Sequence, residues 1–234
     1  MWKRFIAVLI PVLLGLACVF LLPKIQGSFE AAQLNRCMAN LKKIGMALRA
    51  YHDSCGSFPP VATYDNRGKA MLSWRILLLP YLDEDSLYQR FDLSDSWDGE
   101  NNLELLSEMP KVFRCPFDPK AESFMTSYLA VSGQETVFPP QRCVRIQEVK
   151  DGPSLTIAII EIASSRIPWT KPWDVAFEDA SPSPRSLPSP RNWGARSVLL
   201  VDGTTRIVSD ATDPFVWRSL LTIHGSEALA EDDF

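Results

Sequence analysis

An uninterrupted apolar run lies near the start of the chain. Phe5–Leu22 contains no charged side chain, and Lys3 and Arg4 stand immediately before it. A transmembrane helix needs roughly 20 apolar residues, and basic residues at one end favour a cytoplasmic location for that end. The pattern predicts a single-pass anchor in the cytoplasmic membrane, with the N-terminus inside and the following domain outside, on the periplasmic side.

Two other interpretations of this run are a cleaved signal peptide and a lipoprotein modified at Cys18. A signal peptide has an apolar stretch of about 7–15 residues followed by a small-x-small site, whereas this run is longer and lacks such a site. Gly15 stands where lipoprotein signals usually carry a large aliphatic residue. We therefore favour an uncleaved anchor over residues 1–27 and an exported domain over residues 28–234.

After Gly27 the apolar positions recur every three or four residues, which is typical of an amphipathic helix with one buried face. This helix should end near Asp53, because the following glycine and Pro59-Pro60 cannot continue it. The apolar positions are Leu34, Cys37, Leu41, Ile44, Leu48 and Tyr51.

Shorter elements follow. Ser73–Leu79 fits a helix or a buried strand, and Asp85–Phe91 fits a helix. Glu100–Glu108 also fits a helix, with Asp98 as its N-cap. Beyond them the apolar residues alternate with a period of two, which predicts strands. The strand segments are Ser127–Val131, Thr156–Ala163 and Ser197–Val208.

Two segments near the strands predict loops of different kinds. Asp202-Gly203 predicts a two-residue hairpin loop with a type I′ turn, and this structural interpretation is favoured over a metal or ligand site. Glu178–Arg191 contains four prolines, which predicts an exposed loop without regular structure.

Charge and cysteine content narrow the function. The formal net charge is −4 and Lys and Arg form no cluster, so a nucleic-acid partner is not expected. In an oxidising compartment Cys37, Cys55, Cys115 and Cys143 have three pairings. Cys37 lies on the buried helix face and Cys115 just before the strands, so we favour a Cys37–Cys115 disulfide, with Cys55 and Cys143 as a second pair. The absence of a CxxC element argues against zinc.

Seven segments carry a family resemblance: LLPKIQ (Leu21–Gln26), CMANLKKIGMALRAYHDSCGSFPP (Cys37–Pro60), SWRILLLPYLDEDSLYQRFDLSDSWD (Ser73–Asp98), FRCPFDP (Phe113–Pro119), SYLAVSG (Ser127–Gly133), IPWTKPWD (Ile167–Asp174) and LLVDGTTRIVS (Leu199–Ser209). In this order they resemble a bacterial family of membrane-anchored, prepilin-like proteins of unknown function, catalogued under a solute-binding heading. The resemblance implies an α+β, pilin-like fold: a long N-terminal transmembrane helix packed on an antiparallel β-sheet, with short helices inserted.

The chain departs from that family at two places. The family's N-terminus has a Gly before Phe-Thr-Leu and Glu, which marks peptidase cleavage and methylation, whereas this chain reads MWKRFIAVLI. Prepilin-type processing is therefore not implied. The family's C-terminal H-x9-D-G signature places Asn192 where the histidine belongs, so a role that needs an imidazole there is lost.

The sequence offers no catalytic constellation. Its two histidines, His52 and His224, have no evident Cys or Ser partner, and His52 fits a capping or packed imidazole. No cofactor or metal is expected. Five residues are candidate ligand contacts, although a buried ion pair or a cover over the core explains several of them equally well. They are Glu161, Trp169, Lys171, Trp173 and Asn192.

We therefore expect a non-enzymatic, membrane-anchored envelope protein of pseudopilin type, with a structural or interaction role. Its expected partners are membrane lipid and other envelope proteins. The alternative is a membrane-tethered protein that binds a small solute or glycan. A concave, aromatic-lined cleft near Trp169 and Asn192 would favour binding, and a flat exposed apolar patch would favour assembly.

Overall fold

The computed structural model describes residues 31–116, 124–191 and 193–225. The chain divides into two compact units, residues 1–36 and 37–234. The predicted anchor, residues 1–27, lies outside the described residues. Within the described part of the chain, no helix combines the length and the apolar character that a bilayer crossing requires.

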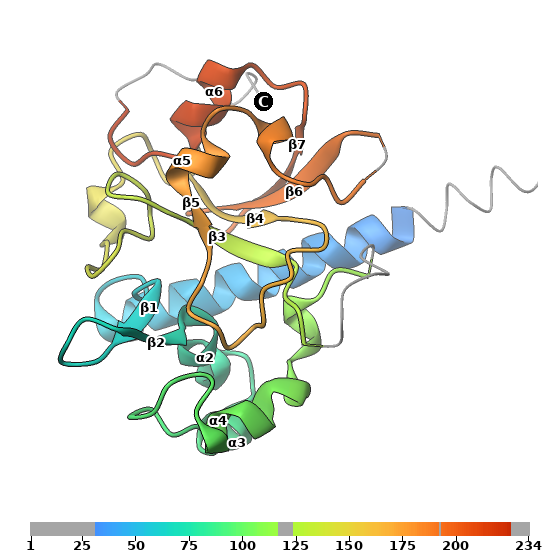
Figure 1. Cartoon of the computed structure of the whole chain (residues 1–234). Helices are drawn as coiled ribbons and strands as arrows, with labels where there is room; N and C mark the ends of the chain where they lie inside the picture. The colour runs from blue at the N-terminus through green and yellow to red at the C-terminus, as the bar shows by residue number, and fades with distance from the viewer. Residues whose placement is uncertain (1–30, 117–123, 192, 226–234) are drawn as a thin grey trace, which may run out of the picture. The chain divides into compact units, whose positions relative to one another are not determined.

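The second unit is an α+β domain built around a mixed five-stranded sheet with the order β5-β3-β4-β6-β7 (Figure 1). The edge strand β5 is parallel to β3, and the other neighbours are antiparallel. A separate antiparallel hairpin is formed by β1 and β2. The strands are β1 (Ala62–Tyr64), β2 (Ala70–Ser73), β3 (Tyr128–Ser132), β4 (Ile157–Glu161), β5 (Val175–Ala176), β6 (Ala195–Leu200) and β7 (Thr205–Ser209).

One long helix and several short ones surround the sheet. The long helix is described over residues 31–55, and Gly56, with a φ of 78°, follows it and donates its amide to the His52 carbonyl. A left-handed glycine at this position is a common helix terminator. The short α-helices are α2 (Trp74–Leu77), α3 (Asp85–Tyr88), α4 (Glu100–Glu104), α5 (Phe177–Ala180) and α6 (Pro214–Leu220), and the 3₁₀ turns are η1 (Leu79–Tyr81), η2 (Leu105–Glu108), η3 (Lys111–Phe113), η4 (Ile146–Glu148) and η5 (Pro184–Ser186).

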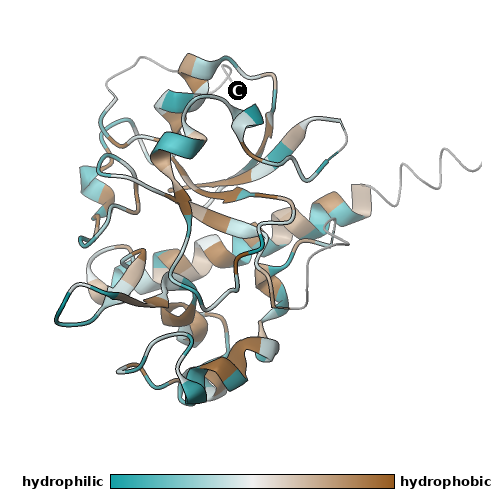
Figure 2. Ribbon diagram, viewed as in Figure 1, coloured by the Kyte–Doolittle hydropathy of each residue, from teal (hydrophilic) through white to brown (hydrophobic). Residues whose placement is uncertain are grey.

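The sheet is buried on both faces. The long helix lies along one face, and α5 and α6 lie over the other (Figure 1). The strands are accordingly mostly brown in the hydropathy colouring, whereas the β1–β2 loop is teal (Figure 2). The helix-side core includes Leu41, Ile44, Leu48, Tyr128, Ala130, Ile159 and Leu199. The opposite core includes Leu129, Val131, Ile160, Val198, Leu200, Trp217 and Leu220. Strands β3, β4 and β6 are therefore buried at nearly every position, so they lack the alternation of buried and exposed residues that a period of two predicts.

A register irregularity in β4 changes which residues face the long helix. The pairing of β4 with β6 shifts between Ile157 and Ile159. Strict alternation would place Ile157, Ile159 and Glu161 on one face, but Ile157 belongs to the opposite core. A bulge of this kind inserts one residue and reverses the alternation on one side of it.

Several element predictions are confirmed and others are corrected. Ser73–Leu79 contains helix α2, and the Ser73 side chain caps it by accepting the Arg75 amide. The residue before α4 is Gly99, so the assignment of Asp98 as N-cap is wrong. Glu178–Arg191 is not without regular structure, because it contains most of α5 and all of η5. The sequence patterns did not indicate the β1–β2 hairpin or α6.

The predicted disulfide is present. Cys37 and Cys115 are bonded, with their Cα atoms 5.3 Å apart and 78 positions between them in sequence. It fastens the long helix to the segment that precedes β3, and Asn40 adds a hydrogen bond of 2.9 Å to the Arg114 carbonyl. Cys55 and Cys143 are free thiols in this structure, and both are exposed.

The β6–β7 turn is not the predicted two-residue type I′ turn. Gly203 has a φ of 89°, but Asp202 is not among the positive-φ residues, and a type I′ turn needs both. Instead Gly203 donates to the Leu200 carbonyl at 3.0 Å and Leu200 donates to the Thr204 carbonyl at 2.9 Å, which closes a wider loop. The amides of Val201 and Asp202 are held by carbonyls of the segment before β4. These outside bonds fix the loop in its wider form.

Asp202→Asn should change the free energy of unfolding by less than about 0.5 kcal/mol. The Asp202 Oδ1 atom accepts the Thr204 amide at 2.8 Å and hydroxyl at 2.7 Å, and an asparagine Oδ1 atom can do the same. Gly203→Val should lower the free energy of unfolding by about 1–3 kcal/mol, because a β-branched residue is strained at positive φ. Steric overlap does not contribute, since no described atom lies within 4 Å of a Cβ added at Gly203. Urea denaturation with and without calcium measures the change in the free energy of unfolding for both variants. Stabilisation of the parent protein by calcium that is absent in Asp202→Asn would contradict the interpretation of Asp202 as a turn residue.

Candidate functional site

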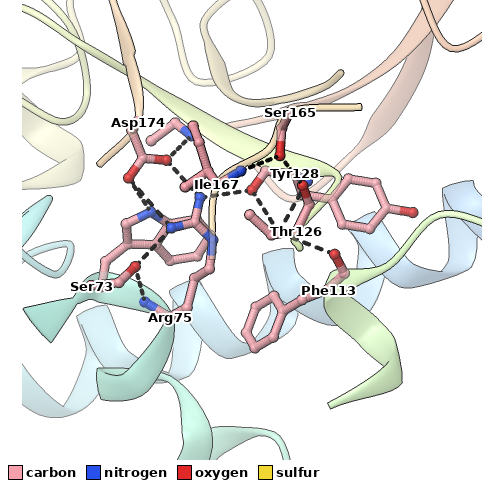
Figure 3. Close-up of polar contacts among 10 residues, drawn as sticks. Ser73, Arg75, Phe113, Thr126, Tyr128, Ser165, Ile167 and Asp174 are labelled. Carbon is pink, nitrogen blue, oxygen red and sulfur yellow. Dashed lines mark hydrogen bonds and ion pairs between the residues drawn. The ribbon is translucent and has the colours of Figure 1, made fainter. Parts of the chain in front are cut away.

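Arg75 is completely buried and its guanidinium group is the centre of a polar cluster inside the domain. Its Nη2 atom donates to Asp174 Oδ1 at 2.7 Å and to the Tyr128 carbonyl at 2.9 Å. Its Nη1 atom donates to the Ser73 hydroxyl at 2.7 Å. Figure 3 shows the guanidinium facing the Asp174 carboxylate, with Ser73 on the opposite side. We call these residues the Arg75 cluster.

Asp174 is the acceptor on which the cluster converges. Its carboxylate also accepts the Ala130 amide at 2.7 Å and the Trp74 indole at 3.1 Å. Burial raises the pKa of the Asp174 carboxyl, and the Arg75 guanidinium and the Ala130 amide act against that rise. Because Ala130 lies in β3 and Asp174 directly precedes β5, the carboxylate joins α2 to the parallel edge of the sheet.

A second group of bonds holds the approach to β3. The Thr126 hydroxyl donates to the Phe113 carbonyl at 3.1 Å, and the Thr126 amide donates to the Ile167 carbonyl at 3.0 Å. The Ser165 hydroxyl donates to the Thr126 carbonyl and accepts the Ile167 amide (Figure 3). Every partner is a backbone group or a hydroxyl, so this part of the network has a structural role.

Glu161 lies in a separate buried ion pair next to the disulfide. Its Oε2 atom accepts from Arg191 at 2.8 Å and from the Ser197 amide at 3.1 Å. One Glu161 oxygen and the sulfurs of Cys37 and Cys115 lie within 4.8 Å of one another. The two sulfurs are bonded to each other and so are not free to act as metal ligands. The ion-pair interpretation of Glu161 is confirmed, and its side chain is fully buried.

Arg196 organises the proline-rich segment between α5 and β6. Its guanidinium is buried and donates to the carbonyls of Pro184 at 2.8 Å and Leu187 at 3.0 Å. It also pairs with Asp210 at 2.9 Å. A buried guanidinium needs several acceptors, and a proline-rich segment supplies carbonyls with few competing amides. This is the physical reason why the segment is fastened rather than freely exposed.

A pocket of about 650 Å³ opens beside the Arg196 side chain. Trp193, which is 56% exposed, provides its one aromatic ring, and Asp210 and Arg185 provide its charged groups. The remaining lining consists of small or polar residues: Ser186, Leu187, Pro188, Ser189, Gly194, Ser209 and Ala211. We call this the Trp193 pocket. Its volume falls within the range of about 300–1,000 Å³ that is usual for small-molecule sites.

The other candidate ligand contacts are dispersed. Trp169 is fully buried, stacks on Phe113 and donates its indole N–H to the Leu106 carbonyl, so it is part of the hydrophobic core. Lys171 lies over the ring of Trp173 at 4.1 Å, and Trp173 is 59% exposed. This pair does not line the Trp193 pocket. Asn192 lies outside the described residues.

His52 has the predicted structural role. Its Nε2 atom accepts the Ile146 amide at 3.1 Å, and its ring packs against Phe58. A second hollow of about 690 Å³ lies beside it. The charged groups of this hollow are Asp53, Arg145, Glu148 and Lys150, and Arg145 and Glu148 pair with each other. Among the described residues, the Nδ1 atom of His52 has no hydrogen-bond partner, and it is 3.7 Å from Asp53 Oδ1.

Comparison with known proteins supports one coarse assignment. A family model described as "Protein of unknown function (DUF1559)" matches residues 30–138. The chain is thus similar to a bacterial family without an assigned activity. The matched residues include the Arg75 side of the cluster and exclude the Trp193 pocket. No curated protein and no solved structure shows significant similarity to the chain.

Asp174→Asn should lower the free energy of unfolding by about 3–5 kcal/mol, because it leaves the Arg75 charge buried without its counterion. The double variant Arg75→Met with Asp174→Asn should cost less than the two single changes added together. The matched control is Glu108→Gln, which breaks an exposed pair whose two N–O distances to Arg90 are both 2.6 Å. Urea denaturation should show almost no change for the control. Equal effects of the buried and exposed changes would contradict a structural role for the Arg75 cluster.

Proposed function

We propose that this protein is a non-enzymatic envelope protein of pseudopilin type, anchored by residues 1–27 and exposed outside the cytoplasmic membrane. The observation that carries the proposal is the long helix, which follows the apolar run in sequence and packs its apolar face on an antiparallel part of the sheet. A helix that is joined to a membrane segment and also built into the domain core holds that domain at the membrane surface.

The buried charges support a scaffold role over a catalytic one. The partners are 99 positions apart in Arg75–Asp174 and 30 apart in Glu161–Arg191, and Arg196–Asp210 joins β6 to the residue after β7. Their donors and acceptors are directed at strands, loops and helix caps. A titratable group used for catalysis needs access to a substrate, and all of these groups except Asp210, which lines the Trp193 pocket, lie inside the domain.

Impermeant maleimide should label Ser186→Cys in intact spheroplasts, because Ser186 is exposed and follows the anchor on the outer side. Ser186 is a better labelling site than the nearby Ser183, because the Ser183 side chain accepts the Arg185 amide and a cysteine there would disturb that hydrogen bond. Cys18, Cys55 and Cys143 are first replaced by serine, so that the label reports only on the introduced thiol. The full chain should stay with membranes after carbonate washing, and deletion of residues 1–27 should release it. Labelling that requires lysis would overturn the topology.

The Trp193 pocket supports a second candidate function, the binding of a small solute or glycan. One exposed indole ring can stack on the apolar face of a sugar, while the serines, Arg185 and Asp210 can exchange hydrogen bonds with its hydroxyls. Arg196 fixes two sides of this pocket in advance, which lowers the entropy lost on binding. This candidate is compatible with the anchored topology.

Trp193→Ala should weaken the binding of a neutral disaccharide by about tenfold. Maltose and diacetylchitobiose serve as the two probes in titration calorimetry of the full chain in detergent. Trp173→Ala is the matched control, because Trp173 is equally exposed but does not line the pocket. Equal losses in both variants, or no saturable binding of either probe, would count against a glycan site here.

A further inference from the structure

Two hydrogen bonds tie the end of the long helix to the segment around Cys143. The Ile146 amide donates to His52 Nε2 at 3.1 Å, and the Phe58 amide donates to the Val144 carbonyl at 2.8 Å. Cys55 lies between His52 and Phe58 in sequence. Cys143 is the residue directly before Val144. The two hydrogen bonds flank Cys55 in sequence and hold the chain around it against the segment that directly follows Cys143.

The two thiols also meet at a common neighbour. Burial raises the pKa of the Tyr51 hydroxyl, and the Cys55 thiol raises it further by charge and by a hydrogen bond. Cys143 adds to this rise by charge. Both thiols thus lie close to one phenol, and both are exposed to solvent. The Cys37 and Cys115 sulfurs, by contrast, are bonded to each other and buried.

We propose that Cys55 and Cys143 are a redox-active pair that forms a second disulfide when the domain meets a small-molecule disulfide. One thiol, as its thiolate, attacks a sulfur of that oxidant, breaks its S–S bond and releases one small thiol. The other protein thiolate then attacks the mixed disulfide and releases the second small thiol. In sum, two protein thiols lose two protons and two electrons, and one small disulfide gains them.

The second bond gives the long helix a covalent fastening at each end of its packed stretch. Cys37–Cys115 holds the beginning of that stretch, and Cys55–Cys143 holds its end. A helix that extends from a membrane anchor transmits any pull on the anchor to the domain. Oxidation therefore strengthens the domain where the helix would otherwise separate from the segment around residue 144. The pairing of the two thiols does not depend on the proposed function, whereas the argument from a pull on the helix rests on the proposed anchor.

The test oxidises the full chain with oxidised glutathione, in detergent and with Cys18 replaced by serine. Peptide mapping without reduction should recover a Cys55 peptide joined to a Cys143 peptide, alongside the Cys37–Cys115 peptides. The melting temperature should rise by roughly 5–15 °C, and a mild reductant should reverse the rise. In the Cys55→Ser variant, Cys143 should instead retain one glutathione, because no second thiol is present to displace it.

The control is the double variant Cys55→Ser with Cys143→Ser. It should melt like the reduced parent protein and should not respond to oxidised glutathione, because the replaced thiols are exposed. Three results would overturn the proposal: stable glutathione on both cysteines of the parent protein, two unmodified thiols, or a Cys55–Cys143 bond only between separate molecules. A fall in melting temperature on oxidation would do so as well.

Discussion

The buried guanidinium of Arg75 imposes a constraint on which much of the domain depends. A cation that is fully removed from water is tolerated only with a counterion and further acceptors around it. Asp174, Ser73 and the Tyr128 carbonyl meet that need from three different segments. Asp174 in turn accepts the Ala130 amide, which places β5 beside β3 in parallel. The contacts of this one charge thus hold helix α2, strand β3 and the edge strand β5 in a single arrangement.

The same logic applies to two other buried guanidinium groups in the domain. Arg191 and Arg196 are both buried, and each pairs with a carboxylate on a neighbouring strand or turn. Arg196 also donates hydrogen bonds to two carbonyls of the proline-rich segment. This segment has the composition of an exposed loop, and in the structure it forms one wall of the Trp193 pocket. The hydrogen bonds of Arg196 therefore hold the residues that line the Trp193 pocket in place. Fixed geometry of this kind is what a binding site requires, and it is also what a rigid scaffold requires.

The long helix connects these internal constraints to the proposed role at the membrane. Its apolar face is part of the core, and its Cys37 is covalently joined to the segment before β3. Gly45 allows a close approach to the sheet, because a Cβ there would lie 2.8 Å from Leu199 Cδ1 and 3.3 Å from Gly203 Cα. The helix is thus a structural member of the domain. In a domain anchored through such a helix, the packing of the core fixes the domain on the helix.

The sequence by itself determined the elements whose signals are local. The amphipathic helix and most strands follow from periodicity, and the positions of Cys37 and Cys115 favour their pairing, which the structure contains. The sequence left Ser73–Leu79 as a helix or a strand, and its capping by Ser73 is seen only in the structure. The partners of the buried charges were decided only by the tertiary structure. Arg75 in an apolar run signals that a partner exists, but Asp174 is 99 positions away. The shift in β4, the wide β6–β7 turn and the Trp193 pocket likewise depend on bonds from other segments. Contacts of this kind depend on the folded path of the chain, which local sequence patterns do not specify.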